Sequence, residues 1–201
     1  MGNCENFVDM TLNSIYEIVD KIIIIFDTTS FDNTKTKLQE WKNKLKEKLI
    51  ILERAFEHDP KIQYSNSNAR NFYLDYLKAN FMDEWVLILD ADECVDERLK
   101  DFIPQLQTLT EEDIISPQMR HLIYTLNLED ATRNIHFVHN RLFKINDKIQ
   151  YPNGEHPVLY STSPNVKYLN TNYFTIFHLG YINGMFDIRK KYLNHKQKSE
   201  I

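Results

Sequence analysis

Three carboxylates stand close together at Asp90, Asp92 and Glu93, directly after the apolar run of residues 85–89, WVLIL. Five apolar residues bounded by polar ones predict a short strand that is buried on both faces. Like charges at short range repel and raise each other's pKa, so this group needs a positive partner. Mg²⁺ and Mn²⁺ bind carboxylate oxygens together with substrate phosphates. Because ligands of open α/β sheets bind beyond the carboxyl ends of strands, the pattern predicts a metal–diphosphate site.

The same acidic residues also have a structural interpretation, because Asp and Glu cap helices that follow a strand. Residues 96–106 show the apolar spacing of such a helix, and Asp96 is a sufficient cap for it. Asp90 and Asp92 are then left without a capping role. The metal site is therefore favoured over capping.

The composition is that of an ordinary globular protein, with 201 residues, 42% of them hydrophobic and 26% charged. A net charge of −5 gives no general electrostatic support for a nucleic-acid partner. The two cysteines, Cys4 and Cys94, lack metal-ligand spacing and fit a reducing compartment. No apolar run has the length of a membrane span, and the start MGNCENFVDM is not a signal peptide. We expect a cytoplasmic protein. Peripheral contact with a membrane surface is compatible with this expectation.

The elements that position the acidic residues follow from hydrophobic periodicity. The first half alternates helices at residues 5–19, 34–48 and 69–79 with strands at residues 21–26, 49–52 and 85–89, which predicts a parallel sheet. The second half has strands at residues 119–128 and 137–145, which we expect to pair antiparallel because their connection is short. A strand at residues 173–177 and a basic helix at residues 186–198 follow. We expect one α/β domain over residues 1–201.

Several short stretches occur in an order that is itself informative. They are NCEN (3–6), VDKIIIIFDTTSFDNT (19–34), NARNFYLDYLK (68–78), WVLILDADE (85–93), NRLFK (140–144), GEHP (154–157) and HLGY (178–181). Together they resemble the family-2 glycosyltransferases of the GT-A fold, in particular small bacterial or viral polysaccharide sugar transferases. The resemblance implies a mostly parallel central sheet flanked by helices, with an antiparallel second half. The family begins with an apolar strand before the NCEN-like turn, so we expect the first central strand to be missing at the N-terminus.

The resemblance implies a donor site for a nucleotide-diphosphate sugar. Asp27 corresponds to the acid that recognises the base or ribose, and Arg70 to an arginine near the nucleotide. Asp90 and Asp92 match the DxD pair, with Ala91 between them lying against the nucleotide sugar. For Asp27 a role in stabilising its own turn stays open, and for Arg70 so does a structural ion pair with Asp90.

The resemblance also implies a metal site and a general base. Asp90, Asp92 and His178 are the expected ligands of Mn²⁺ or Mg²⁺, while a satisfied histidine in a turn is the alternative for His178. Glu155 is the candidate base that activates the acceptor hydroxyl, and the order GEHP leaves His156 as its rival. An exposed loop glutamate is the structural alternative for Glu155. Asp92 is expected to be essential for catalysis.

These features predict a metal-dependent, inverting glycosyltransferase that moves a sugar, by default from a UDP-sugar, to a hydroxyl of a glycan or polysaccharide. Two other classes stay open. One is a phosphatase or nucleotidyltransferase with a DxD strand end, although in haloacid-dehalogenase-type phosphatases the motif opens the fold and a Thr or Val stands where this chain has Cys94. The other is a non-catalytic module that binds a nucleotide sugar or glycan.

Overall fold

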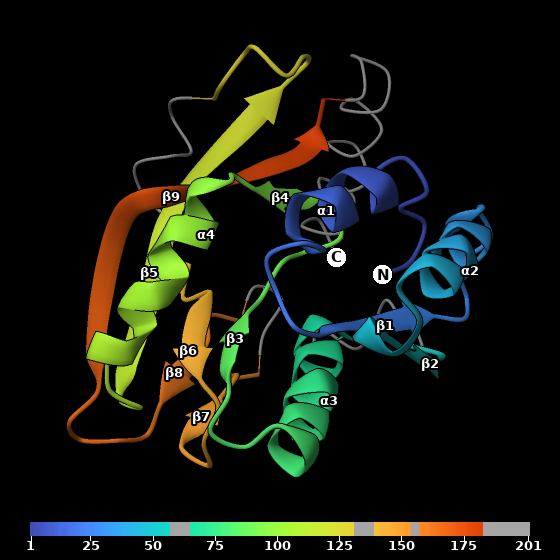
Figure 1. Cartoon of the computed structure of the whole chain (residues 1–201). Coiled ribbons are helices and arrows are strands. Elements are labelled where there is room, and N and C mark those ends of the chain that lie inside the picture. Colours follow the sequence, from blue (N-terminus) through green and yellow to red (C-terminus); the bar gives the residue numbers. More distant parts are fainter. Residues whose placement is uncertain (57–64, 131–138, 154–156, 183–201) are drawn as a thin grey trace, which may run out of the picture.

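A computed structural model describes residues 1–56, 65–130, 139–153 and 157–182 (Figure 1). The helices of these ranges are α1 (Val8–Ile15), α2 (Thr34–Leu45), α3 (Ser65–Asn80) and α4 (Arg98–Phe102), with 3₁₀ helices η1 (Lys46–Lys48) and η2 (Ile103–Thr108). The strands are β1 (Ile22–Asp27), β2 (Leu49–Arg54), β3 (Trp85–Leu87), β4 (Glu93–Val95), β5 (Asp113–Ile123), β6 (Leu142–Lys144), β7 (Ile149–Gln150), β8 (Tyr160–Ser161) and β9 (Lys167–Tyr181). The fold is therefore mixed α/β.

The strands described form separate sheets rather than one continuous one. β1 and β2 make a parallel pair, β7 and β8 an antiparallel pair, and five strands make a sheet in the order β3-β6-β5-β9-β4. Within that sheet β5 and β9 are parallel, whereas the β3–β6, β5–β6 and β4–β9 pairs are antiparallel. The expectation of a mostly parallel central sheet is therefore wrong for the described residues. The physical reason is that β3 pairs with β6 and not with β1.

β1 lies between helices on its two faces. In Figure 1, α1 and α2 lie above the β1–β2 pair and α3 lies below it. Ile24 is buried in a cluster with Leu12 of α1 and Leu38 of α2, whereas Ile23 packs against a cluster that contains Leu74 of α3. Burial on both faces is the environment that the IIIIF sequence predicts.

The strand expected at residues 85–89 differs from its prediction. β3 is shorter, from Trp85 to Leu87, and its residues are half-buried. The expectation of burial on both faces is wrong because β3 stands at the edge of the five-stranded sheet. The backbone of Ile88 then donates a hydrogen bond to the Arg141 carbonyl at 2.8 Å and leads into the acidic turn.

The second half differs most from its prediction. The helix expected at residues 96–106 is shorter, because Pro104 lacks an N–H and α4 gives way to η2. The strand expected at residues 119–128 begins earlier, as β5. The strand expected at residues 173–177 is part of β9, which extends through the HLGY stretch. The β5–β6 pair is antiparallel as predicted, and the helix expected at residues 186–198 lies outside the described residues.

The N-terminal turn is held against the turn that follows β1. The backbone N–H of Cys4 donates to Thr34 Oγ1 at 2.9 Å, and that of Glu5 donates to Asp32 Oδ2 at 3.0 Å. Asp32 Oδ1 also accepts the N–H of Thr34 at 3.0 Å, so Asp32 stabilises this turn. These bonds place the NCEN stretch beside Asp27.

Replacing Thr34 by valine is expected to destabilise the fold by about 1–3 kcal/mol, because the buried N–H of Cys4 loses its acceptor while the side-chain volume is kept. Urea unfolding at constant m-value measures the change. The exposed Thr36 of α2 provides the matched control, for which Thr36→Val is expected to change the stability by less than about 0.5 kcal/mol. Equal effects of the two substitutions would contradict the prediction.

Candidate active site

The acidic turn of residues 90–93 connects the end of β3 to β4. Its backbone is fixed by a hydrogen bond from the Glu93 N–H to the Asp90 carbonyl at 3.1 Å. Thr11 of α1 donates its hydroxyl to the Ala91 carbonyl at 2.8 Å, so Ala91 is held from the helix side. Antiparallel pairing of β4 with β9 places Glu93 opposite His178. The turn is thereby clamped between α1 and β9.

Two arginines supply the positive charge that the acidic turn requires. Arg70 Nη2 of α3 contacts both carboxylate oxygens of Asp90, at 2.9 and 3.1 Å. Arg141 Nη2 contacts Asp90 Oδ2 at 3.0 Å and Glu93 Oε1 at 2.7 Å, while Glu93 Oε2 accepts the Asp90 N–H at 2.7 Å. The structural ion pair considered for Arg70 is confirmed. The guanidinium of Arg141 was not assigned a role from the sequence.

The surroundings of Glu93 and Asp90 shift the pKa values of these two carboxylates in opposite directions. The Arg141 and Glu93 side chains are 6% and 1% exposed, whereas that of Asp90 is 39% exposed. Burial raises the pKa of Glu93 to about 7, an effect that Arg141 only partly opposes. Burial also acts on Asp90, but Arg141 and Arg70 together hold its pKa well below the usual range. Asp90 is therefore the ionised partner of both arginines at neutral pH.

Asp92 points toward His178. Its Oδ2 lies 3.5 Å from His178 Nε2, and its carbonyl accepts the N–H of Leu179 at 2.7 Å. The resemblance predicted that Asp92 and His178 are ligands of the same metal ion. The pairing of β4 with β9 brings the two residues together. The alternative of a turn histidine is wrong, since His178 lies inside a strand.

The rings of His178, His121 and His139 lie close together. The ring centroids of His121 and His178, which are register partners in β5 and β9, are 5.0 Å apart, and those of His121 and His139 are 6.4 Å apart. The pKa of His139 is lowered to about 4, mainly by burial and secondly by the positive charge of Arg141. His139 is therefore neutral at physiological pH.

The depressed pKa of His139 predicts a pH dependence of stability. Between about pH 6.5 and pH 4 the unfolded chain binds a proton that the folded chain does not, so stability falls as the pH is lowered through this interval. His139→Gln is expected to flatten that fall by about 0.5 kcal/mol per pH unit, an amount reduced for partial exposure. Urea unfolding at pH 4.5, 5.5, 6.5 and 7.5 measures the slope. An unchanged slope would show that His139 does not titrate in this way.

Asp27 ends β1 and stabilises its own turn. Its Oδ1 accepts the N–H and the hydroxyl of Thr29 at 3.0 and 2.8 Å, so the turn role considered from the sequence is confirmed. Burial lowers the pKa of the Met1 ammonium, while Cys4, Asp27 and Asp90 act on it in the opposite sense. Nucleotide recognition by Asp27 stays a prediction. The candidate bases Glu155 and His156 lie outside the described residues.

The chemistry of the residues gathered here bears on the predicted divalent ion. Asp92 and His178 form a carboxylate–imidazole pair that suits Mn²⁺, with a diphosphate supplying further oxygens. Asp90 is bound by two arginines, and no group of three or more His, Cys, Asp or Glu side chains in the described ranges is arranged to hold a metal. The residues fit an ion held by two protein ligands and by substrate, and the ion stays a prediction.

Comparison with known proteins places this geometry in a known fold. No protein family and no curated protein matches the chain by sequence. Two solved structures of TarS from S. aureus do match it in structure, with TM-scores of 0.52 and 0.51 at 20% and 19% identity. Each alignment covers 76% of this chain. The chain therefore shares its fold with a part of TarS.

The shared region is only a part of the TarS chains. The alignments cover 29% of one TarS chain and 48% of a shorter one, residues 1–349. This chain therefore spans less than half the length of these neighbours. At this identity the likeness concerns the fold and leaves the site residues to be argued from their own geometry.

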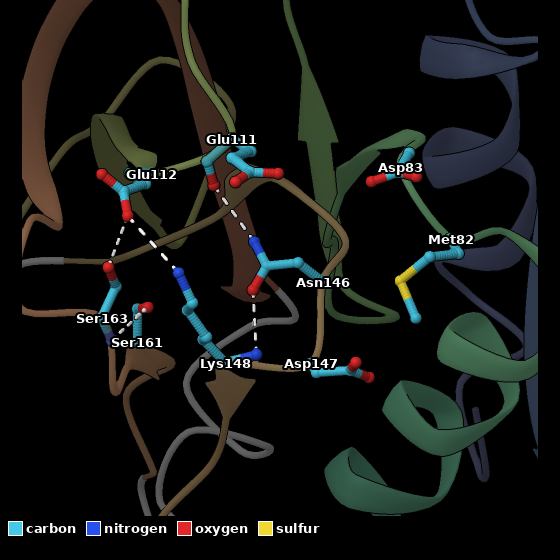
Figure 2. A pocket seen from close by; sticks show the side chains of 9 residues that line it. All are labelled: Met82, Asp83, Glu111, Glu112, Asn146, Asp147, Lys148, Ser161 and Ser163. Carbon is cyan, nitrogen blue, oxygen red and sulfur yellow. Dashed lines mark hydrogen bonds and ion pairs between the residues drawn. The ribbon is translucent and has the colours of Figure 1, made fainter.

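Two cavities border opposite ends of β3. Arg70, Arg141, Tyr151 and His139 help to line a cavity of about 40 Å³ beside the acidic turn. A larger pocket of about 310 Å³ lies near Asp83, which precedes β3. Figure 2 shows the side chains that line it. In the larger pocket Glu112 already accepts a hydrogen bond from Ser163 and forms an ion pair with Lys148, so these polar groups satisfy one another. The small cavity is the one that belongs to the candidate active site.

Within the described ranges, the helices are too short or too polar to cross a lipid bilayer.

Proposed function

We propose that the protein is a metal-dependent, inverting glycosyltransferase that moves a sugar from a nucleotide-diphosphate sugar, by default a UDP-sugar, to a hydroxyl of a glycan or polysaccharide. The observation that carries the proposal is the pairing of Asp92 with His178 at the carboxyl end of β3, within a glycosyltransferase-like fold. The structural neighbour TarS is a wall teichoic acid glycosyltransferase, which supports this class of reaction.

The residues of the acidic turn have separable tasks in this proposal. Asp92 and His178 would hold Mn²⁺ or Mg²⁺, which neutralises the charge that develops on a departing nucleoside diphosphate. Asp90 contacts ribose or metal-bound water through the face that its arginines leave exposed. Asp27 recognises the base or ribose by accepting hydrogen bonds.

In this proposal the two arginines orient the acidic turn and the donor. Arg141 is buried and already contacts two carboxylates, so it keeps the turn rigid when substrate arrives. Arg70 is more exposed and lines the small cavity, where its guanidinium is available to an anionic part of the donor. The acceptor hydroxyl needs a base opposite the leaving group, for which Glu155 and His156 are the proposed candidates.

A screen of nucleotide sugars with and without Mn²⁺ tests the proposal. A bound donor should raise the melting temperature by an amount that grows with the logarithm of its concentration divided by its dissociation constant, and only in the presence of the metal. The best donor is then incubated with glycan acceptors, and the released nucleoside diphosphate and the anomeric configuration of the product are measured. Binding without turnover would favour the non-catalytic module. Hydrolysis of phosphoesters without sugar transfer would favour a phosphatase or nucleotidyltransferase.

A further inference from the structure

The ion pair between Arg70 and Asp90 fixes only one corner of the guanidinium group. Both contacts come from Arg70 Nη2, which lies 2.9 and 3.1 Å from the two carboxylate oxygens. An arginine–carboxylate pair that uses two nitrogens in parallel also fixes the plane of the guanidinium. Because arginine is a long side chain with many rotamers, a pair made by one nitrogen leaves that plane to be set by a second contact.

The ring of Tyr151 supplies such a contact. The central carbon of the Arg70 guanidinium lies over this ring, 5.6 Å from its centroid. A cation at this distance is attracted by the electrons of the aromatic face, and the flat guanidinium is suited to stacking. Tyr151 directly follows β7 and is 6% exposed, so little water competes with the contact. The ring therefore restricts the tilt of the guanidinium.

Helix α3, which carries Arg70, also holds Tyr151. Tyr73 of α3 donates its hydroxyl to the Tyr151 hydroxyl at 2.8 Å, and the two rings meet edge to face with centroids 6.0 Å apart. The buried Ser67, also of α3, donates to the Pro152 carbonyl at 3.1 Å. Arg70 and Tyr73 are three residues apart in the helix and so lie on one face of it. The arginine and the ring beneath it are thus fixed to the same element.

The remaining nitrogens of Arg70 border the candidate donor site. Nη1 and Nε take no part in the contacts with Asp90. Arg70 and Tyr151 line the small cavity beside the acidic turn together with Arg141. The side chain of Arg70 is 21% exposed and that of Arg141 6%, so Arg70 is the arginine that an incoming anion reaches. A diphosphate can accept hydrogen bonds from Nη1 and Nε without displacing Asp90, provided that the guanidinium keeps its plane.

We propose that Tyr151 is a positioning residue for donor binding, which acts through Arg70. Its ring holds the guanidinium in the plane in which Nη2 stays on Asp90 while the other N–H groups are offered to the diphosphate of the donor. Tyr73 in turn holds the ring. The inference rests on the proposed function, but its first step, the restraint of Arg70 by Tyr151, is measured without any ligand.

Three variants of the full chain test the restraint. Tyr151→Phe keeps the ring and loses the hydroxyl, whereas Tyr151→Met removes the ring and keeps an adaptable apolar side chain. Tyr76→Met is the matched control, because Tyr76 of the same helix packs against Phe81. Nitrogen exchange NMR measures the rate of rotation about the Nε–Cζ bond of Arg70, whose signals are assigned with Arg70→Lys. The rate should rise at least about tenfold in Tyr151→Met and less than about threefold in Tyr151→Phe and in the control.

Donor binding is measured next, by titration calorimetry with UDP and Mn²⁺. The Kd is expected to rise about tenfold in Tyr151→Met and to stay within about threefold in Tyr151→Phe and in Tyr76→Met. Tyr151→Phe should nevertheless lower the melting temperature, because the Tyr73 hydroxyl loses its acceptor. A Kd that follows the melting temperature across these variants would overturn the proposal, since Tyr151 would then serve stability alone.

A change of ring charge at constant shape completes the test. Trifluorophenylalanine at position 151 has nearly the size of the phenylalanine in Tyr151→Phe, but its fluorine atoms withdraw electrons and weaken the attraction for a cation. It should raise both the rotation rate of Arg70 and the Kd for UDP. Equal values in the two chains would overturn the proposal, and this comparison stays decisive if Tyr151→Met does not fold. If the unmodified chain binds neither UDP nor a nucleotide sugar with Mn²⁺, the proposed function fails, and the rotation rates alone decide whether Tyr151 positions Arg70.

Discussion

Arg141→Met is expected to destabilise the protein by about 3–5 kcal/mol, because the buried Glu93 loses its cationic partner and the ionised Asp90 loses one of its two arginines. The side chain of Arg141 is 6% exposed, so water cannot replace the lost contacts. Methionine keeps most of the side-chain volume, which limits the contribution of packing. Urea unfolding monitored by tryptophan fluorescence gives the change.

Two further variants identify the source of that loss. The exposed ion pair of Arg120 with Glu129 provides a surface control, for which Arg120→Met should cost less than about 1 kcal/mol. Adding Glu93→Gln to Arg141→Met replaces the carboxyl group that lost its partner by a neutral amide, whose oxygen can still accept the Asp90 N–H, so the double variant is expected to recover part of the stability. A loss below 1 kcal/mol in Arg141→Met, or no recovery in the double variant, would refute this account of the network.

Asp92→Asn is expected to lower sugar transfer at least about 100-fold, because the amide is a much weaker metal ligand while its shape is preserved. The prediction rests on the proposed function. Initial rates of nucleoside diphosphate release, measured with saturating Mn²⁺, give the effect, and the melting temperature without ligand shows whether the fold is intact.

Asp83→Asn is the matched control for Asp92→Asn. Asp83 precedes β3, at the opposite end from the acidic turn, and borders the larger pocket. The same change of charge there should leave the transfer rate within about twofold. If Asp92→Asn retained the rate of the control, Asp92 would have no role in catalysis.

The sequence located the acidic turn but not its partners. The run WVLIL followed by Asp90 and Asp92 predicted a strand end with carboxylates, and two residues separate the end of β3 from the acidic turn. The missed partner, Arg141, belongs to an element distant in sequence, and local periodicity contains no information on such contacts. One signal was present, since an arginine directly before Leu142 and Phe143 in a buried strand needs an acidic partner.

The hydrophobic pattern of the sequence also did not predict the topology of the five-stranded sheet. Alternating helices and strands correctly predicted the parallel β1–β2 pair. The length of β9 and its parallel pairing with β5 depend on which edges meet in three dimensions, and polar residues such as Asn170 and Thr171 concealed the first part of that strand. Propensity is a weak guide where cross-strand packing decides the pairing.

β9 has a consequence for how the protein is made. Asp92 and His178 come together only when this strand, synthesised long after the acidic turn, pairs with both β4 and β5. Contacts between segments so distant in sequence close large loops and form slowly. During translation the acidic turn therefore stays incomplete until β9 has left the ribosome.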